Sequence, residues 1–120
     1  MQITKCLHTA ILVSDLEKAE EFYGQVLELP KVERSLNYPG AWYQLGEYQI
    51  HLIVDSQVKI ESFNTKKWGR NAHLAFSVNN IRAAQERLQK KGYPLQLSSS
   101  GRPALFTKDA DGNVIELSQL

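Results

Sequence analysis

The chain has 120 residues, enough for one modest hydrophobic core but not for two independently stable domains. Its 14 basic and 13 acidic residues give a formal net charge of +1, so neither nucleic acid nor an anionic membrane is an expected partner. The longest apolar runs are too short to span a bilayer, no signal-peptide pattern opens the chain, and the single cysteine, Cys6, has no internal disulfide partner; we therefore expect a cytoplasmic protein.

The first elements expected along the chain are a strand and a helix. HTAILV at 8–13 is a short apolar run typical of a strand, and Ser14 with Glu17 forms a capping box that predicts a helix start. The apolar residues that follow recur at helical spacing until Pro30, which ends the pattern. The next stretch is rich in strand formers and is divided by two glycine-containing turn signals. The first half is therefore predicted as a strand, a helix and three strands.

The second half repeats the first at an offset of 65 residues. HLAFSVNNIRAAQE at 73–86 is a relative of HTAILVSDLEKAEE at 8–21, which indicates two copies of one supersecondary unit. Asn79 is placed to cap the second helix, and Gly92 is placed to end it. Further turn signals divide the residues that remain into strands, so each copy is predicted to be a βαβββ module.

The two copies define the expected domain organisation. Residues 1–120 are predicted to form a single α+β domain, with module 1 over about 1–54, a polar linker over 55–71 and module 2 over about 72–120. The densest basic patch of the chain lies in this linker and consists of Lys66, Lys67 and Arg70 with Trp68. We interpret it as a solvated linker, because three charges without a wider basic field give little affinity for a nucleic acid backbone.

Side chains of a strand alternate between the two faces of a sheet, so each predicted strand divides by parity. One face is apolar, as with Ile50 and Leu52 on the fourth strand, and suits packing beneath a helix. The opposite face carries a histidine or a glutamate at positions that the offset of 65 relates in pairs. These four residues, which include every histidine of the chain, are His8 with His73 and His51 with Glu116.

A single histidine on a half-exposed strand is more often structural than a metal ligand. All three histidines and a glutamate at equivalent positions nevertheless favour one shared site. A cluster of imidazoles with a carboxylate suits Zn, Fe, Ni or Mn, whereas Ca or Mg would need more oxygen ligands. Three neutral imidazoles and one carboxylate would leave a divalent ion with about one positive charge, which favours Lewis-acid chemistry.

The segments HTAILVSDLEKAEEFYGQVLEL, HLAFSVNNI and DADGNVIEL together resemble the vicinal oxygen chelate superfamily. That group includes glyoxalase I, methylmalonyl-CoA epimerase, fosfomycin-resistance thiol transferases, extradiol dioxygenases and bleomycin-resistance proteins. The resemblance covers nearly the whole chain. It implies two βαβββ modules with pseudo-twofold symmetry that form a curved sheet cup with helices outside. It also implies a homodimer, sometimes with modules exchanged between subunits.

The resemblance further implies that one divalent metal (Ni, Zn, Fe or Mn) is bound by His8, His51, His73 and Glu116. The chain departs from the family at the second of these positions, where glyoxalase I has a glutamate and the epimerase a glutamine. In a glyoxalase or epimerase reaction, Glu116 would be the base that moves a proton and His51 would be a ligand. In an extradiol dioxygenase, Fe(II) would be held by the other three residues, and His51 would act as an acid or base.

Three functions follow from this comparison. The first is a glyoxalase-like lyase or isomerase whose small substrate is chelated through neighbouring oxygens, and the second is an extradiol-type Fe(II) dioxygenase. The third is a metal-free small-molecule binding protein of the bleomycin-resistance kind, although such proteins lack the histidine set. Candidate substrate contacts lie beside the ligand strands, where core packing is at least as common a role; they are Trp42, Tyr43, Arg102 and Phe106.

Overall fold

The structure, a computed structural model, describes residues 1–120. The chain divides into two compact modules, Met1–Val58 and Lys59–Leu120. The boundary between them falls inside the segment that was expected to be a linker. None of the helices has the length and apolar character needed to cross a bilayer.

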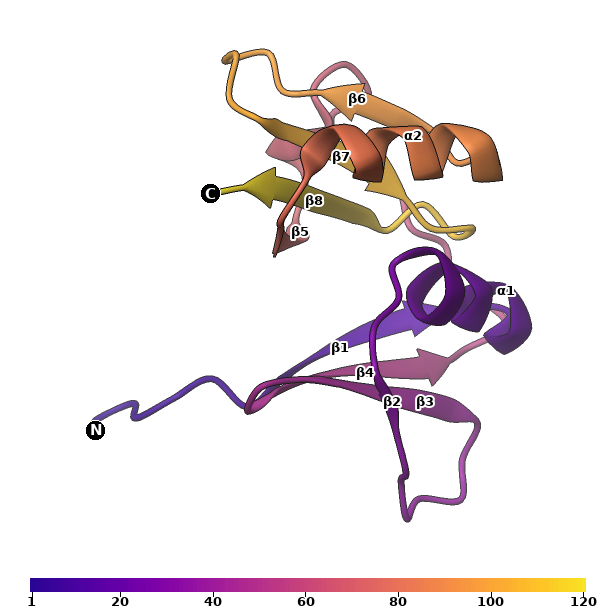
Figure 1. Cartoon of the computed structure of the whole chain (residues 1–120). Helices are drawn as coiled ribbons and strands as arrows, with labels where there is room; N and C mark the ends of the chain where they lie inside the picture. Colours follow the sequence, from indigo (N-terminus) through magenta and orange to yellow (C-terminus); the bar gives the residue numbers. More distant parts are fainter. The chain divides into compact units, whose positions relative to one another are not determined.

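Module 1 is a four-stranded mixed sheet with one helical segment against it (Figure 1). The strand order is β1-β4-β3-β2, with β1 parallel to β4 and the other pairs antiparallel. In chain order the elements are β1 (His8–Val13), α1 (Leu16–Glu20), η1 (Glu21–Val26), β2 (Lys31–Val32), β3 (Gly40–Leu45) and β4 (Tyr48–Val54).

Module 2 has the same topology. Its strand order is β5-β8-β7-β6. The edge strand β5 is again parallel to its neighbour β8, and the other pairs are antiparallel. The elements are η2 (Trp68–Arg70), β5 (His73–Val78), α2 (Ile81–Lys91), β6 (Leu95–Leu97), β7 (Ala104–Lys108) and β8 (Val114–Gln119). The prediction of an α+β fold made of two βαβββ modules is therefore confirmed.

In each module the apolar strand face packs under the helix, as parity predicts. Ile50 and Leu52 of β4 are fully buried in module 1, and Leu105 and Ile115 are fully buried in module 2 together with Leu88 of α2. Burial of one such side chain contributes about 1.5–3 kcal/mol to stability. The opposite strand face is therefore left for polar groups.

The first helix differs from a regular α-helix after its first turn. Its second part, η1, is π-helical, and the Leu27 N–H donates to the carbonyl of Phe22, five residues earlier, at 2.9 Å. Phe22, Tyr23 and Val26 are all buried in this part. These three side chains form the face of the first helix that belongs to the core.

The two helix caps lie one residue beyond the predicted positions. Asp15, not Ser14, caps α1, and its carboxylate accepts from the Lys18 N–H at 3.1 Å. Asn80, not Asn79, caps α2 by accepting from the Ala83 N–H at 3.0 Å. Both caps have extended backbone torsions, which is what an N-cap requires. The N-cap of each helix is therefore the residue that follows the predicted one.

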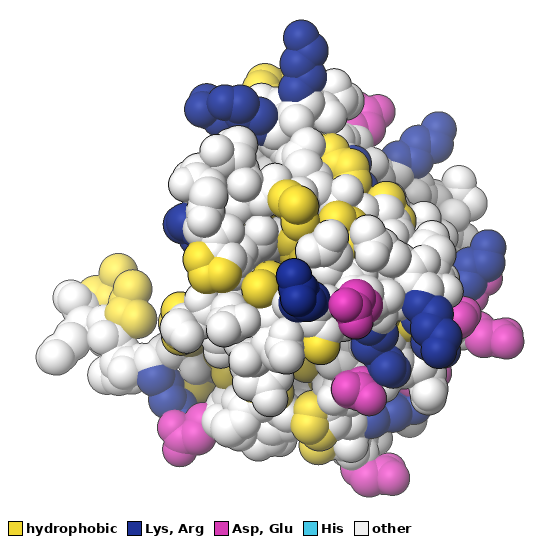
Figure 2. Space-filling view, turned by 45° about the horizontal axis from the view of Figure 1, so that its top comes forward, with side chains coloured by type: hydrophobic (Ala, Val, Ile, Leu, Met, Phe, Trp, Pro, Cys, Tyr) yellow, Lys and Arg dark blue, Asp and Glu magenta, His cyan; other side chains and the backbone are white.

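Residues 59–71 belong to module 2 and contact its sheet. The backbone N–H of Trp68 donates to the side-chain oxygen of Gln96 on β6 at 2.9 Å. The ammonium of Lys108 on β7 lies 4.2 Å from the centroid of the Trp68 ring, in a cation–π contact. The face shown in Figure 2 carries basic and acidic side chains of both signs interspersed, in agreement with the net charge of +1.

Replacing the observed cap tests this assignment against the neighbouring residue. We expect Asn80→Ala to lower the free energy of unfolding by about 1 kcal/mol, because the Ala83 N–H loses its partner. Asn79→Ala, the matched control one residue earlier, should change it by less than about 0.5 kcal/mol. Urea unfolding followed by circular dichroism measures both. Equal losses, or a larger loss for Asn79→Ala, would contradict the assignment.

Candidate functional site

His8 and His51 lie together on the polar face of the module 1 sheet. In the parallel pairing of β1 and β4, Ala10 stands opposite His51. His8 precedes Ala10 by two residues and lies on the same face of β1. The two imidazole rings stack at 4.1 Å between centroids with an interplanar angle of 12°. The Trp42 indole of β3 stacks on His51 at 4.2 Å and 8°. His51 is thus held between two rings from the strands on either side.

The hydrogen bonds of His51 fix which ring nitrogen is available. Its Nε2 lies 2.8 Å from the side-chain oxygen of Gln49, whose own amide nitrogen donates to Gln44 at 3.0 Å. Because the Gln49 oxygen can only accept, Nε2 carries the proton and Nδ1 of the neutral ring keeps a lone pair. Burial lowers the pKa of His51, and His8 and Arg34 nearby lower it further. The neutral form that binds metals is therefore favoured.

His73 and Glu116 form the corresponding pair in module 2. Ala75 stands opposite Glu116 in the parallel pairing of β5 and β8, just as Ala10 stands opposite His51. The His73 Nδ1–H donates to the backbone carbonyl of Asn71 at 2.7 Å. The other ring nitrogen, Nε2, lies 3.2 Å from Oε1 of Glu116. The side chains of the two residues are 22% and 14% exposed.

Glu116 is held as a carboxylate by its neighbours. The Ser118 hydroxyl donates to its Oε2 at 2.6 Å and is the main reason why the pKa of Glu116 lies below its usual value. His73 and Arg102 lower this pKa further, while partial burial opposes them. The Arg102 guanidinium lies 3.8 Å from the same oxygen, Oε2. Oε1, the oxygen that faces His73, is left to interact with a ligand.

The contact between His73 and Glu116 has a chemical requirement. Because Nδ1 is already a donor, Nε2 of a neutral His73 presents a lone pair to a carboxylate oxygen, and two acceptors repel unless a cation lies between them. The cation is either a proton or a metal ion. Two ligands at about 2.1 Å from a tetrahedral ion are separated by about 3.4 Å, close to the observed spacing.

Both His51 and His73 also show the outer contacts that metal-binding histidines usually have. In each, one ring N–H donates to an amide oxygen, which leaves the second nitrogen with its lone pair. The residue types and their hydrogen bonds therefore fit a divalent metal. Neither module by itself brings together three His, Cys, Asp or Glu side chains. Each module supplies one pair of the predicted set.

Three of the four predicted substrate contacts lie on the face that carries these pairs. Trp42 stands opposite His51 on β3, and Phe106 stands opposite Glu116 on β7 at the equivalent position. The Phe106 ring meets His73 edge-on, with 5.5 Å between centroids. Arg102 contacts Glu116 as described above. These three residues border the candidate site.

Tyr43 does not line this face, and its predicted role as a substrate contact is corrected. It follows Trp42 on β3 and so points to the opposite side, where it is 1% exposed and its hydroxyl packs against Gly24 of η1. Burial raises the pKa of Tyr43 to about 12, with a further contribution from the Glu20 carboxylate. Tyr43 is a core residue beneath the first helix.

Three supporting residues were not identified from the sequence, namely Gln49, Asn71 and Ser118. Gln49 and Ser118 each lie two positions from a predicted ligand on the same strand, so parity places them on the same face. The alternation of strand faces could therefore have identified both residues from the sequence. Asn71 acts through its backbone carbonyl, which any residue would provide, so no sequence signal marks it.

Comparison with known proteins agrees with the topology. A model of the Glyoxalase/Bleomycin resistance protein/Dioxygenase superfamily matches residues 5–117. The chain is 32% identical over 128 residues to the mitochondrial methylmalonyl-CoA epimerase of Mus musculus, a match that covers 93% of this chain and 71% of that protein. It is 29% identical over 126 residues to the lactoylglutathione lyase of Salmonella typhimurium, with 94% and 90% covered.

The fold also matches solved structures. The crystal structure of a protein assigned to the glyoxalase family, from Bacillus anthracis, has a TM-score of 0.79 at 23% identity and covers 99% of this chain and 97% of that chain. A family match over nearly the whole length and the repeated βαβββ topology lead to the same conclusion. The chain belongs to the Glyoxalase/Bleomycin resistance protein/Dioxygenase superfamily, within the vicinal oxygen chelate group.

Proposed function

We propose that the protein is a metal-dependent isomerase or lyase that acts on a small substrate bound through two neighbouring oxygens. The observation that carries the proposal is the contact between His73 and Glu116. An imidazole nitrogen and a carboxylate oxygen lie 3.2 Å apart, a spacing at which both can bind one metal ion. The epimerase and lyase names of the relatives support this class of reaction.

The ligands of the metal would be His8, His51, His73 and Glu116, one pair from each module. We propose that the two pairs meet on one ion, either within a chain or between two subunits that exchange modules. Zn, Ni, Fe and Mn all accept imidazole and carboxylate ligands. A divalent ion bound there would stabilise negative charge that develops on the substrate oxygens.

Glu116 is the residue best placed to move a proton. Its Oε2 is fixed by Ser118 and faces Arg102, so the orientation of the carboxylate is set by this chain. The carboxylate can accept a proton from a carbon next to the substrate carbonyl. Trp42 and Phe106 supply apolar surface on either module that would keep water from a reacting carbanion.

An extradiol-type dioxygenase is the second candidate, and one observation favours it. His51 holds a proton on Nε2 and lies between Trp42 and His8, which is compatible with a proton-transferring residue beside an Fe(II) site of the other three residues. A metal-free binding protein is the third candidate. It is less well supported, because proteins of the bleomycin-resistance kind lack the histidine set that this chain carries.

The first test is metal retention. We expect protein purified without chelators to contain about one divalent metal per chain. His73→Ala and Glu116→Ala should each abolish tight binding, because loss of one ligand removes both a bond and the geometry of the site. Elemental analysis after dialysis identifies the metal. Nickel or zinc would favour proton transfer, and iron would favour oxygen chemistry.

Ser77→Ala provides the matched control for this test. Ser77 lies on the same face of β5 as His73 but is no part of the proposed set, so its replacement should leave the metal content unchanged. If the alanine variants of all four proposed ligands keep wild-type metal content, or the wild type binds no divalent ion, the enzyme proposal fails and a binding protein takes its place.

The second test concerns His51. We expect His51→Ala to weaken metal affinity as strongly as His73→Ala. The hydrogen bond from His51 to Gln49 uses Nε2, so the lone pair of Nδ1 remains available to bind the metal ion. A loss of only about 10- to 100-fold is typical of a residue that acts through a ligand, and would favour the dioxygenase. His51→Glu restores the glyoxalase-like set and should keep or gain isomerisation of the methylglyoxal–glutathione adduct if the lyase assignment is right.

The third test concerns assembly. We propose a homodimer, since β1 and β5 form long edges of their sheets and such edges favour pairing with another chain. Light scattering at micromolar concentration should give twice the mass of the chain. A mass equal to one chain would contradict the dimer and require the metal site to form within a single chain.

A further inference from the structure

Arg34, in the loop between β2 and β3, lies on the polar face of the module 1 sheet. A methyl group at Gly40 of β3 would stand 3.5 Å from Cζ of Arg34, so the guanidinium lies where a side chain at that position would point. Trp42, two residues further along β3, points to the same face and stands opposite His51. Arg34 also lowers the pKa of His51. The guanidinium therefore shares a face with the proposed metal ligands of module 1.

The guanidinium of Arg34 has one anchored edge and one free edge. Its Nη1–H donates to the backbone carbonyl of Gly40 at 3.3 Å. Nε and Nη2 are buried and have no hydrogen-bond partner in the protein. The N–H groups of these two nitrogens are parallel in a guanidinium, and together they match the two oxygens of a carboxylate. Buried charged donors without an acceptor are costly, so an acceptor at this free edge would stabilise the protein.

Arg34 lines a groove of about 490 Å³ in module 1, a volume that is usual for small-molecule sites. Val32 and Leu36 supply apolar walls, and Leu36 is 41% exposed. The Lys31 ammonium in the lining already has a carboxylate partner. Glu33, the acidic residue of the lining, forms no ion pair with Arg34. The groove therefore combines apolar walls with one guanidinium that has no counter-ion.

Tyr38 covers the guanidinium from one side. Cζ of Arg34 lies 4.7 Å from the centroid of the Tyr38 ring, in a cation–π contact. Tyr38 is 46% exposed and belongs to the loop between β2 and β3, which contains no helix or strand. A cation–π contact at an exposed position is weaker than two charge-assisted hydrogen bonds. An incoming carboxylate can therefore displace the ring and reach Nε and Nη2.

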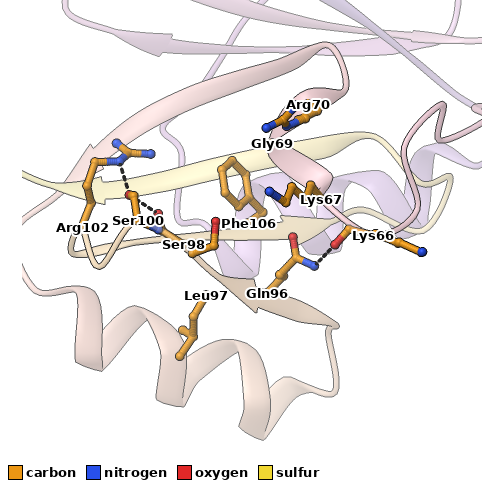
Figure 3. A pocket seen from close by; sticks show the side chains of 11 residues that line it. Lys66, Lys67, Gly69, Arg70, Gln96, Leu97, Ser98, Ser100, Arg102 and Phe106 are labelled. Carbon is orange, nitrogen blue, oxygen red and sulfur yellow. Dashed lines mark hydrogen bonds between the residues drawn. The ribbon is translucent and has the colours of Figure 1, made fainter.

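Module 2 offers a comparison, because it contains a cavity of about 480 Å³ that is also lined by basic residues (Figure 3). The Arg102 Nε–H donates to a serine hydroxyl of the loop between β6 and β7 at 3.2 Å, and Nη1 lies 3.8 Å from Oε2 of Glu116. Lys67 and Arg70, which also line this cavity, are exposed to water. Of the basic side chains, Arg34 is the one with buried N–H groups that lack an acceptor.

We propose that Arg34 binds a carboxylate of the substrate through Nε–H and Nη2–H, and that the substrate is a small carboxylic acid with an apolar body. This inference rests on the proposed function for the rest of the substrate, whose two neighbouring oxygens bind the metal. The carboxylate at Arg34 is a separate group, and it fixes the position of the substrate beside His51. A neutral amide of the same shape would turn an N–H group toward the guanidinium and leave a buried donor unpaired. Arg34 therefore determines specificity for an acid over its amide.

The test follows the binding of benzoate and benzamide to the full chain, dialysed against a chelator, by two-dimensional NMR. Benzoate should bind with a Kd in the millimolar range, and the Nε–H signal of Arg34 should shift and exchange more slowly with water. Benzamide should bind about tenfold more weakly. Arg34→Gln should weaken benzoate binding by about tenfold or more, because hydrogen bonds between charged groups are among the strongest in proteins. Arg34→Lys keeps the charge without the two parallel donors and should lose about threefold or more.

Lys18→Gln is the matched control, because it removes an exposed charge from α1, on the opposite face of the sheet, and should not change benzoate affinity. Equal affinities for benzoate and benzamide, an unmoved Arg34 Nε–H signal, or unchanged affinity in Arg34→Gln overturns the inference. The signal of the unmodified chain decides the outcome even where a variant does not fold. Because binding is measured without metal, a chain that holds metal but does not bind benzoate loses only this inference. A chain that binds benzoate through Arg34 but holds no metal loses only the proposed metal-dependent function.

Discussion

The parallel pairing of the first and last strand in each module is the constraint on which the candidate site depends. It sets Ala10 opposite His51 and Ala75 opposite Glu116. An alanine leaves space on the polar face, so the residue two positions earlier on the edge strand can lean toward its partner on the inner strand. That residue is a histidine in both modules. A one-residue shift of either pairing would turn each histidine toward the helix, where only apolar side chains fit.

The same register produces two chemically different pairs. In module 1 two imidazoles stack with an indole, and burial, together with His8 and Arg34 nearby, lowers the pKa of His51. In module 2 an imidazole faces a carboxylate whose charge is stabilised by a hydroxyl and an arginine. One module therefore carries two imidazoles, and the other carries an imidazole with the anionic group. The module topology is duplicated, but only one copy carries the carboxylate that we propose moves the proton.

Much of this arrangement could be predicted because it depends on periodicity. The offset of 65 residues and the alternation of strand faces were sufficient to place the two pairs on the polar faces and to predict two βαβββ modules. The helix caps were missed by one residue because Ser14–Asp15 and Asn79–Asn80 each offer two suitable side chains, and only the backbone torsions decide between them. Tyr43 was misplaced because adjacent residues on a strand point to opposite faces, and Trp42 already occupies the polar one.

What periodicity cannot predict is the role of residues outside the strands. The segment around Lys67 and Arg70 looks like a linker because it is polar, yet Gly69 packs directly on Phe106 and brings both charges to the edge of a cavity. The loop that ends at Arg102 is similarly irregular in sequence. Both segments can change without disturbing the register of β5 and β8, which positions His73 and Glu116. Since loops vary more readily than paired strands, substrate preference can diverge on this fold while the proposed ligand pairs stay in place.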